Sequence, residues 1–244
     1  MRNTLYIIML FFLTCVFVDD IFALETSLVL NTSNAPPNST EDHRGIGDRV
    51  VTEAFKRIGI KVRILKVPSE RALINANNGI EDGNFARIEG IEAQYPNLIM
   101  VSEEITRFEF VVFSKKDNLK PAGWRWLKPY NVGIVTGWKI LENNIRQTKY
   151  LITVKDEKIL FGLLKADKAD IVIYDKMQGL TYLKDIDETG IKYSEPPLAV
   201  RNMYIYLNKR HKALIPKLTE AIRDIKRDGT YKNIIEEVIN NNSR

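Results

Sequence analysis

Short apolar runs and amphipathic segments alternate along most of the chain. Val50, Ala54 and Ile58 recur at the spacing of one helix face, and Gly59 follows them as a stop signal. Strands that alternate with helices in this way predict an α/β fold around a largely parallel sheet. The predicted strands cover residues 27–30, 61–65, 80–86, 132–135, 151–154, 170–174 and 203–207; the predicted helices cover 50–58, 68–76, a segment from 138, 157–164, 176–183 and two final segments separated at 228–229.

The first residues have the pattern of an export signal. Arg2 supplies a positive charge, and the apolar run Leu5–Val18 is shorter than the ~20 residues that a spanning helix needs. Ala23 is a small residue before a cleavage point, so residues 1–23 are predicted to be a signal peptide and the mature chain to begin at Leu24 in the periplasm. An uncleaved N-terminal anchor is the alternative interpretation.

Charge and cysteine content narrow the possible chemistry. The chain has 36 basic and 31 acidic residues and a net charge of +5, with no long basic block, which disfavours nucleic-acid binding. Cys15 is the single cysteine and lies inside the predicted signal, so the mature chain is expected to have neither a disulfide nor a thiolate metal site. His43 and His211 lack ligand-like spacing, and we predict no metal and no cofactor.

Five segments in order resemble the family 3 bacterial extracellular solute-binding proteins, the receptors of polar-amino-acid uptake systems. They are GDRVVTEAFKRIGIKV from Gly47, GIEDGNFAR from Gly79, WLKPYNVGIVTG from Trp126, LLKADKADIVIYD from Leu163, and LNKRHKALIPKLTEAIRDIKRDGTYKNI from Leu207. The similarity extends over nearly the whole chain that follows the predicted signal.

The resemblance implies the type II periplasmic-binding-protein fold, in which two α/β lobes are joined by two crossing strands. Lobe one would comprise residues 24–106 plus 201–244, and lobe two residues 107–200. The protein would be a monomer that closes on a small polar, amino-acid-like solute and delivers it to an inner-membrane ABC permease. Physical reasoning also places a cleft at the carboxyl ends of the strands, beside helix N-termini that attract anions.

Asp175 follows the apolar strand and precedes a helix, so its carboxylate is expected to face the cleft. The resemblance implies that Asp175 binds the amino group of the ligand, and a buried ammonium does need such a partner. The alternative is that Asp175 caps the helix. Tyr174, just before it, is either a contact of the ligand or a wall residue.

The turn Thr136-Gly137-Trp138 joins a predicted strand to a predicted helix. The resemblance implies that backbone N–H groups of this turn receive a ligand carboxylate, as a helix N-terminus does. Trp138 replaces the small or hydroxyl residue typical of the family and indicates an aromatic wall. Plain turn chemistry is the alternative for Gly137.

The arginine that clamps the ligand carboxylate in this family would fall at Gln94, counted from Asp82. Arg87, at the end of the preceding strand, and Arg71, near the start of the preceding helix, are the replacement candidates. A planar guanidinium suits bidentate binding of a carboxylate. The alternative for both is a solvated position on the rim of the cleft.

These features favour a transport receptor over two other classes of protein. A periplasmic sensor for a membrane signalling partner would use the same cleft. A dehydratase-like enzyme on this scaffold would need an acid or base, for which Asp175 and Glu89 are available. We find no nucleophile motif and no phosphate-binding loop, so we predict no catalytic residues and a protein that is not an enzyme.

Overall fold

The computed structural model describes residues 27–242, so the predicted signal peptide and Cys15 lie outside the described residues. The strands are β1 (Ser27–Thr32), β2 (Lys61–Lys66), β3 (Gly83–Arg87), β4 (Leu98–Met100), β5 (Thr106–Ser114), β6 (Asn131–Val135), β7 (Tyr150–Val154), β8 (Ile171–Asp175) and β9 (Lys192–Asn208). The α-helices are α2 (Ile46–Arg57), α3 (Ser69–Asn77), α4 (Lys139–Asn144), α5 (Glu157–Lys165), α6 (Lys176–Asp185), α7 (Ile215–Arg227) and α8 (Thr230–Asn242). Three short 3₁₀ helices complete this part of the chain, at Ile91–Ala93, Trp124–Leu127 and Lys209–Leu214.

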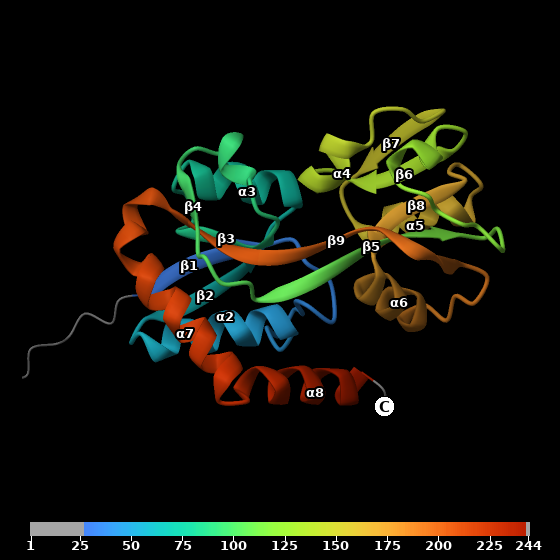
Figure 1. The fold of residues 1–244 in the computed structure, drawn as a ribbon. Coiled ribbons are helices and arrows are strands. Elements are labelled where there is room, and N and C mark those ends of the chain that lie inside the picture. The colour runs from blue at the N-terminus through green and yellow to red at the C-terminus, as the bar shows by residue number, and fades with distance from the viewer. Residues whose placement is uncertain (1–26, 243–244) are drawn as a thin grey trace, which may run out of the picture.

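The strands of residues 27–242 form one curled mixed sheet in the order β2-β1-β3-β9-β5-β8-β6-β7, with β4 paired to β9. We call the half around β1–β4 lobe one and the half around β6–β8 lobe two. In lobe one, β1 pairs in parallel with β2 and β3; in lobe two, β6 pairs in parallel with β7 and β8. Helices α2, α3, α7 and α8 lie on lobe one, and α4, α5 and α6 lie on lobe two (Figure 1).

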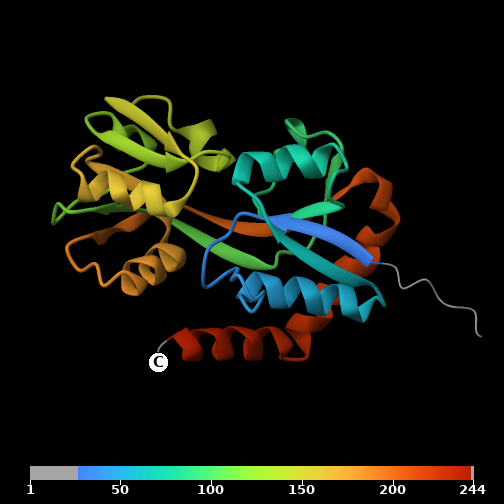
Figure 2. The ribbon, with the colours of Figure 1, turned by 180° about the vertical axis from the view of Figure 1, so that it is seen from behind.

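The two lobes are joined by β5 and β9, which run side by side from one to the other (Figure 1). They pair antiparallel from Thr106↔Met203 to Ser114↔Lys192, and the last residues of β9 then pair with β3 and β4 in lobe one. The predicted strand at 203–207 is therefore only the end of a much longer strand. The segment after β1 lies between the lobes when the molecule is viewed from behind (Figure 2).

Each lobe has an apolar core that follows from the strand and helix patterns. Val50, Val51, Ala54 and Phe55 on α2 are fully buried in lobe one. The first turn of α2 is fixed by Asp48, whose carboxylate accepts hydrogen bonds from Ser39 Oγ at 2.7 Å and from the N–H groups of Thr40 and Gly45 at 3.0 and 3.1 Å. In lobe two, both faces of β8 are covered, which explains its continuous apolar run.

Element boundaries also differ from the sequence prediction before β3. The predicted strand at 80–86 begins only at Gly83, because the Asp82 carboxylate accepts a hydrogen bond from Val29 N–H at 2.8 Å and pairs with Arg210 at 2.5 Å. These contacts turn the chain ahead of the strand. No helix within residues 27–242 is long and apolar enough to span a membrane.

Candidate functional site

Two adjoining cavities lie between the lobes, and Ser33 and Trp138 line both of them. The cavity volume is about 30 Å³ for the inner chamber and about 260 Å³ for the outer chamber. The inner chamber is lined further by Asn34, Ala86, Arg87, Ile88, Ile91, Phe108, Phe110, Gly137, Lys139, Ile140 and Met203. The outer chamber is lined further by Lys66, Val67, Pro68, Val135, Lys155, Asp156, Glu157 and Tyr174.

A bulge at the end of β3 places Arg87 at the inner chamber. The pairing of β3 with β9 shifts between Phe85 and Arg87, and Ala86 between them has a φ of 58°, in the left-handed region. A bulge of this kind changes the direction of the following side chain, and a residue other than glycine adopts it only where the surrounding structure holds it. The left-handed conformation of Ala86 is therefore part of the bulge that orients the Arg87 side chain.

The Arg87 side chain is 6% exposed and contacts both lobes. Its Nε donates to Asn84 Oδ1, Nη1 donates to Ser69 Oγ at 2.7 Å, and Nη2 donates to the Ser69 carbonyl at 3.0 Å. Nη1 also reaches the Gly137 carbonyl of lobe two at 3.4 Å. All of these partners are neutral, and within residues 27–242 no carboxylate is in ion-pair contact with this guanidinium. Burial lowers the pKa of Arg87 to about 10.

The turn that contains Gly137 packs directly against lobe one. Gly137 has a φ of 86°, and a Cβ at this position would stand 2.4 Å from the Glu70 nitrogen and 2.8 Å from the Ser69 carbonyl carbon. Only glycine allows this approach of the two backbones. Gly137 N–H donates to Glu142 Oε1 at 2.5 Å, so a carboxylate of the chain itself occupies the N–H group that we assigned to a ligand. Half-buried Thr136 donates its N–H to the Val154 carbonyl.

An ionic cluster joins the lobes beside this turn. Lys139 Nζ in lobe two lies 2.6 Å from Glu70 Oε2 in lobe one and 2.8 Å from Glu142 Oε2 on its own helix. Tyr95 Oη donates to Glu70 Oε1 at 2.7 Å. Burial alone lowers the pKa of Lys139, but the hydrogen bonds that it donates to Glu142 and Glu70 outweigh this effect, so the net shift is upward. Lys139 therefore stays charged and holds both carboxylates.

Trp138 stands at the boundary of the two chambers and is held by other aromatic rings. It stacks on Tyr174 with centroids 4.6 Å apart and an interplanar angle of 15°, and its edge meets Phe110 at 5.7 Å. Phe108 lies 6.2 Å from the Trp138 ring. The aromatic wall that the sequence indicated at Trp138 lies at this boundary, with Tyr174 on its outer side.

Asp175 is 1% exposed and lines neither chamber. It caps α6: Oδ1 accepts from Gln178 N–H at 3.1 Å, and Oδ2 accepts from Glu109 N–H at 3.1 Å. Burial raises the pKa of Asp175 to about 6 against the opposing effect of these hydrogen bonds. Gln178 Oε1 in turn accepts from Ala35 N–H in lobe one at 2.8 Å. These are the contacts of a helix cap, the alternative role that the sequence left open for Asp175. They connect Asp175 to lobe one only through Gln178.

Arg71 is exposed on α3 and lines neither chamber. Two lysines of the chambers were not predicted from the sequence: Lys66, at the end of β2, and Lys139, whose partner Glu70 lies 69 residues away along the chain. Lys66 Nζ donates to the Asn34 and Ser39 carbonyls, and burial lowers its pKa. The position of Lys66 at the carboxyl end of a strand was the signal that could have identified it.

The groups of three or more His, Cys, Asp or Glu side chains that a metal needs are absent from residues 27–242.

No protein-family model matches the chain. A protein of Shewanella oneidensis, described as uncharacterized, is 26% identical over 191 residues, which cover 75% of this chain and 72% of that protein. Among solved structures, the substrate binding protein of an amino acid ABC transporter aligns with a TM-score of 0.71 and 17% identity, covering 86% of this chain and 98% of that one.

Two further structures come from other functional settings. The GluR0 ligand-binding core in complex with L-glutamate has a TM-score of 0.76 and 12% identity, covering 87% of this chain and 97% of that one. A histidine kinase sensor domain with similarity to periplasmic binding proteins has a TM-score of 0.72 and 13% identity, covering 86% and 95%. At these identities the similarity shows the fold alone, and that fold is the one that the resemblance implied. The chain therefore has the two-lobed α/β fold of the type II periplasmic binding proteins.

Proposed function

We propose that this protein is an exported solute-binding protein that captures a small solute carrying an anionic group between its two lobes. The observation that carries this proposal is the buried guanidinium of Arg87 at the wall of the inner chamber. A charge removed from water costs several kcal/mol unless a partner compensates it. Glu70 and Glu142 act on Arg87 only at a distance, because their oxygens contact Lys139, Tyr95 and the Gly137 N–H.

A carboxylate in the inner chamber would supply the missing partner. The Arg87 contacts leave one N–H of Nη2 without an acceptor, and Lys139 lines the same chamber. A guanidinium binds a carboxylate more strongly and with more defined geometry than an ammonium group does. The anionic group is thus proposed to lie beside Arg87, in place of the clamp at Gln94 that the family pattern implied.

Contacts between the lobes support capture by closure. Lys139 pairs with Glu70, Gln178 accepts from Ala35, and Arg87 reaches Gly137, each across the cleft. Such polar contacts form and break as a hinge closes and opens around β5 and β9. A solute that fits between the lobes would add its own binding energy to the closed state.

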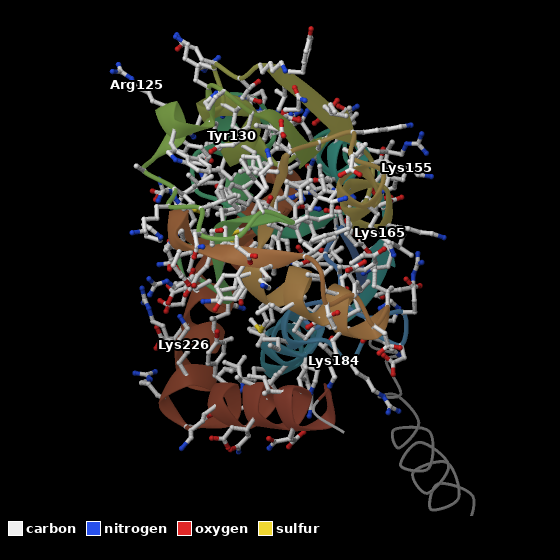
Figure 3. The ribbon with its side chains drawn as sticks, turned by 90° about the vertical axis from the view of Figure 1, so that its right-hand side faces the viewer. Arg125, Tyr130, Lys155, Lys165, Lys184 and Lys226 are labelled. Atoms are coloured by element: carbon white, nitrogen blue, oxygen red, sulfur yellow. The ribbon has the colours of Figure 1, made fainter. Side chains whose placement is uncertain are left out.

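The partner is proposed to be an inner-membrane ABC permease, in the periplasm, because one neighbour is the binding protein of an amino acid ABC transporter. A signalling partner is the second candidate, since another neighbour is the sensor domain of a histidine kinase. On lobe two, Arg125 points outward on one side of the view, and Lys155 and Lys165 point outward on the other (Figure 3). We propose binding without catalysis and a monomer that does not bind nucleic acid.

Native mass spectrometry of protein purified from the periplasm without refolding tests the proposal. It should identify a co-purifying solute with a carboxylate or another anionic group. Arg87→Ala should then weaken binding of that solute. Arg87→Lys should weaken it to a smaller extent, because an ammonium group cannot replace the parallel N–H donors of a guanidinium. Arg71→Ala is the matched control, because it removes an exposed arginine of lobe one that lines neither chamber. This variant should bind the solute as tightly as wild type does. Equal affinity in all four proteins would refute the role of Arg87.

A further inference from the structure

We infer that the inner chamber selects a small carboxylate with an apolar body and no ammonium group, such as a branched or aromatic monocarboxylic acid. The inference rests on the proposed function, because it takes the inner chamber as the solute site. It departs from the amino-acid-like ligand that the resemblance implied. Three features of the described residues support it: the composition of the walls, the state of the nearby carboxylates, and the contrast with the outer chamber.

The walls of the inner chamber are mainly apolar. Its side-chain cations are Arg87 and Lys139, and of these Lys139 is already held by two carboxylates. An apolar wall gains free energy when it covers an apolar ligand group and loses it when it covers a polar group without a partner. The apolar members of the wall are Ala86, Ile88, Ile91, Phe108, Phe110, Trp138, Ile140 and Met203.

An ammonium group would find no carboxylate on this wall. The chamber is lined by no Asp or Glu among the described residues. Asp175, the partner that the resemblance implied, accepts hydrogen bonds from Gln178 and Glu109 and lies outside the lining. Glu70 and Glu142 are bound to Lys139. An α-amino acid would therefore leave its charged amino group buried without a partner, which disfavours binding.

The outer chamber, in contrast, is lined by charged side chains of both signs. Lys66 and Lys155 line it together with Asp156 and Glu157, at the start of α5. Charges of both signs could hold both ends of a zwitterion, and half-buried Lys66 donates to the Asn34 and Ser39 carbonyls. Arg87 at the inner chamber is 6% exposed and has no carboxylate on the same wall among the described residues, so a carboxylate without an ammonium group is expected there.

Matched pairs of ligands test the inference on the wild-type protein. 4-Methylpentanoate and leucine share one carbon skeleton and differ in the α-ammonium, as do 3-phenylpropanoate and phenylalanine. Calorimetric titration should show at least about tenfold tighter binding of the acid than of the amino acid in one or both pairs. 4-Methylpentanamide, which lacks the charge, should bind more weakly than its acid.

A substitution at Ile88 tests whether the lack of a carboxylate on the chamber wall causes the preference for the acid. Ile88 is half-buried at the chamber wall, so Ile88→Glu would add a carboxylate there, and Ile88→Gln is its neutral control. Ile88→Glu should move the preference toward the amino acid by at least about tenfold relative to Ile88→Gln.

The outcomes separate the inference from the proposed function. If leucine or phenylalanine binds wild type as tightly as its acid, or if neither acid binds, the inference is wrong. The proposed function would still stand if the co-purified solute is anionic and depends on Arg87. If that solute carries no anionic group, the proposed function fails as well.

Discussion

Gly137→Ala should separate closure of the lobes from folding. The added Cβ would lie 2.4 Å from the Glu70 nitrogen, which is a backbone atom of lobe one, so the two lobes must move apart. In an open form the same methyl group would face solvent. The substitution therefore acts against the closed state in particular, and the solute should lose affinity because it binds that state best.

The magnitude follows from two separate costs. A left-handed alanine costs about 1–2 kcal/mol in any folded form, open or closed, and lowers the free energy of unfolding. The backbone clash adds about 1–3 kcal/mol to the closed form alone, as overpacking of tight contacts does. Because about 1.4 kcal/mol corresponds to tenfold in affinity, the solute should bind about five- to 150-fold more weakly.

Calorimetric affinity and small-angle scattering, measured with and without the solute, check this result. Gly229→Ala is the matched control, since Gly229 also has a positive φ, 85°, but a Cβ there would meet nothing within 4 Å. It should lose about 1 kcal/mol of stability and keep its affinity. Gly137→Ala should keep a larger radius of gyration with solute than wild type does. Equal losses of affinity in the two variants would refute the clash argument.

Three further outcomes follow from the structure and the sequence. The pKa of Asp175 is raised to about 6, so the native state holds this proton to a higher pH than the unfolded chain, and the free energy of unfolding should fall as pH rises from about 4 to about 6. Denaturant unfolding of Asp175→Asn should lack this decline, whereas parallel pH profiles would contradict it. Lys139→Met should remove the contact with Glu70 and speed solute dissociation about fivefold or more in stopped-flow measurements, with exposed Lys128→Met unchanged. Protein exported to the periplasm should have an intact mass that begins at Leu24, and a full-length chain there would favour the anchor.

The sequence predicted the fold well because the fold depends on local patterns. The apolar run before Asp175 and the helix face around Ala54 each indicate one element without reference to the rest of the chain. Boundaries failed where distant contacts act, as before β3, where Asp82 binds Val29 and Arg210. Such contacts override local preference and leave no periodic signal.

The candidate site was harder to predict from the sequence. The bulge at Ala86 has an ordinary residue in a left-handed conformation, so no glycine marks the turn that directs Arg87. The pair of Lys139 and Glu70 joins residues 69 positions apart and depends on how the lobes meet. For Asp175, a cap and a ligand contact have the same sequence pattern, and only the position of Gln178 shows the capping contact.

An anionic solute is proposed to be captured beside Arg87, between the lobes. A crystal structure of the protein with its co-purified solute tests this most directly. We expect density for the solute in the inner chamber, with an anionic oxygen about 2.7–2.9 Å from Arg87 Nη2. A solute bound elsewhere, or one that places a neutral or cationic group beside Arg87, would contradict the claim.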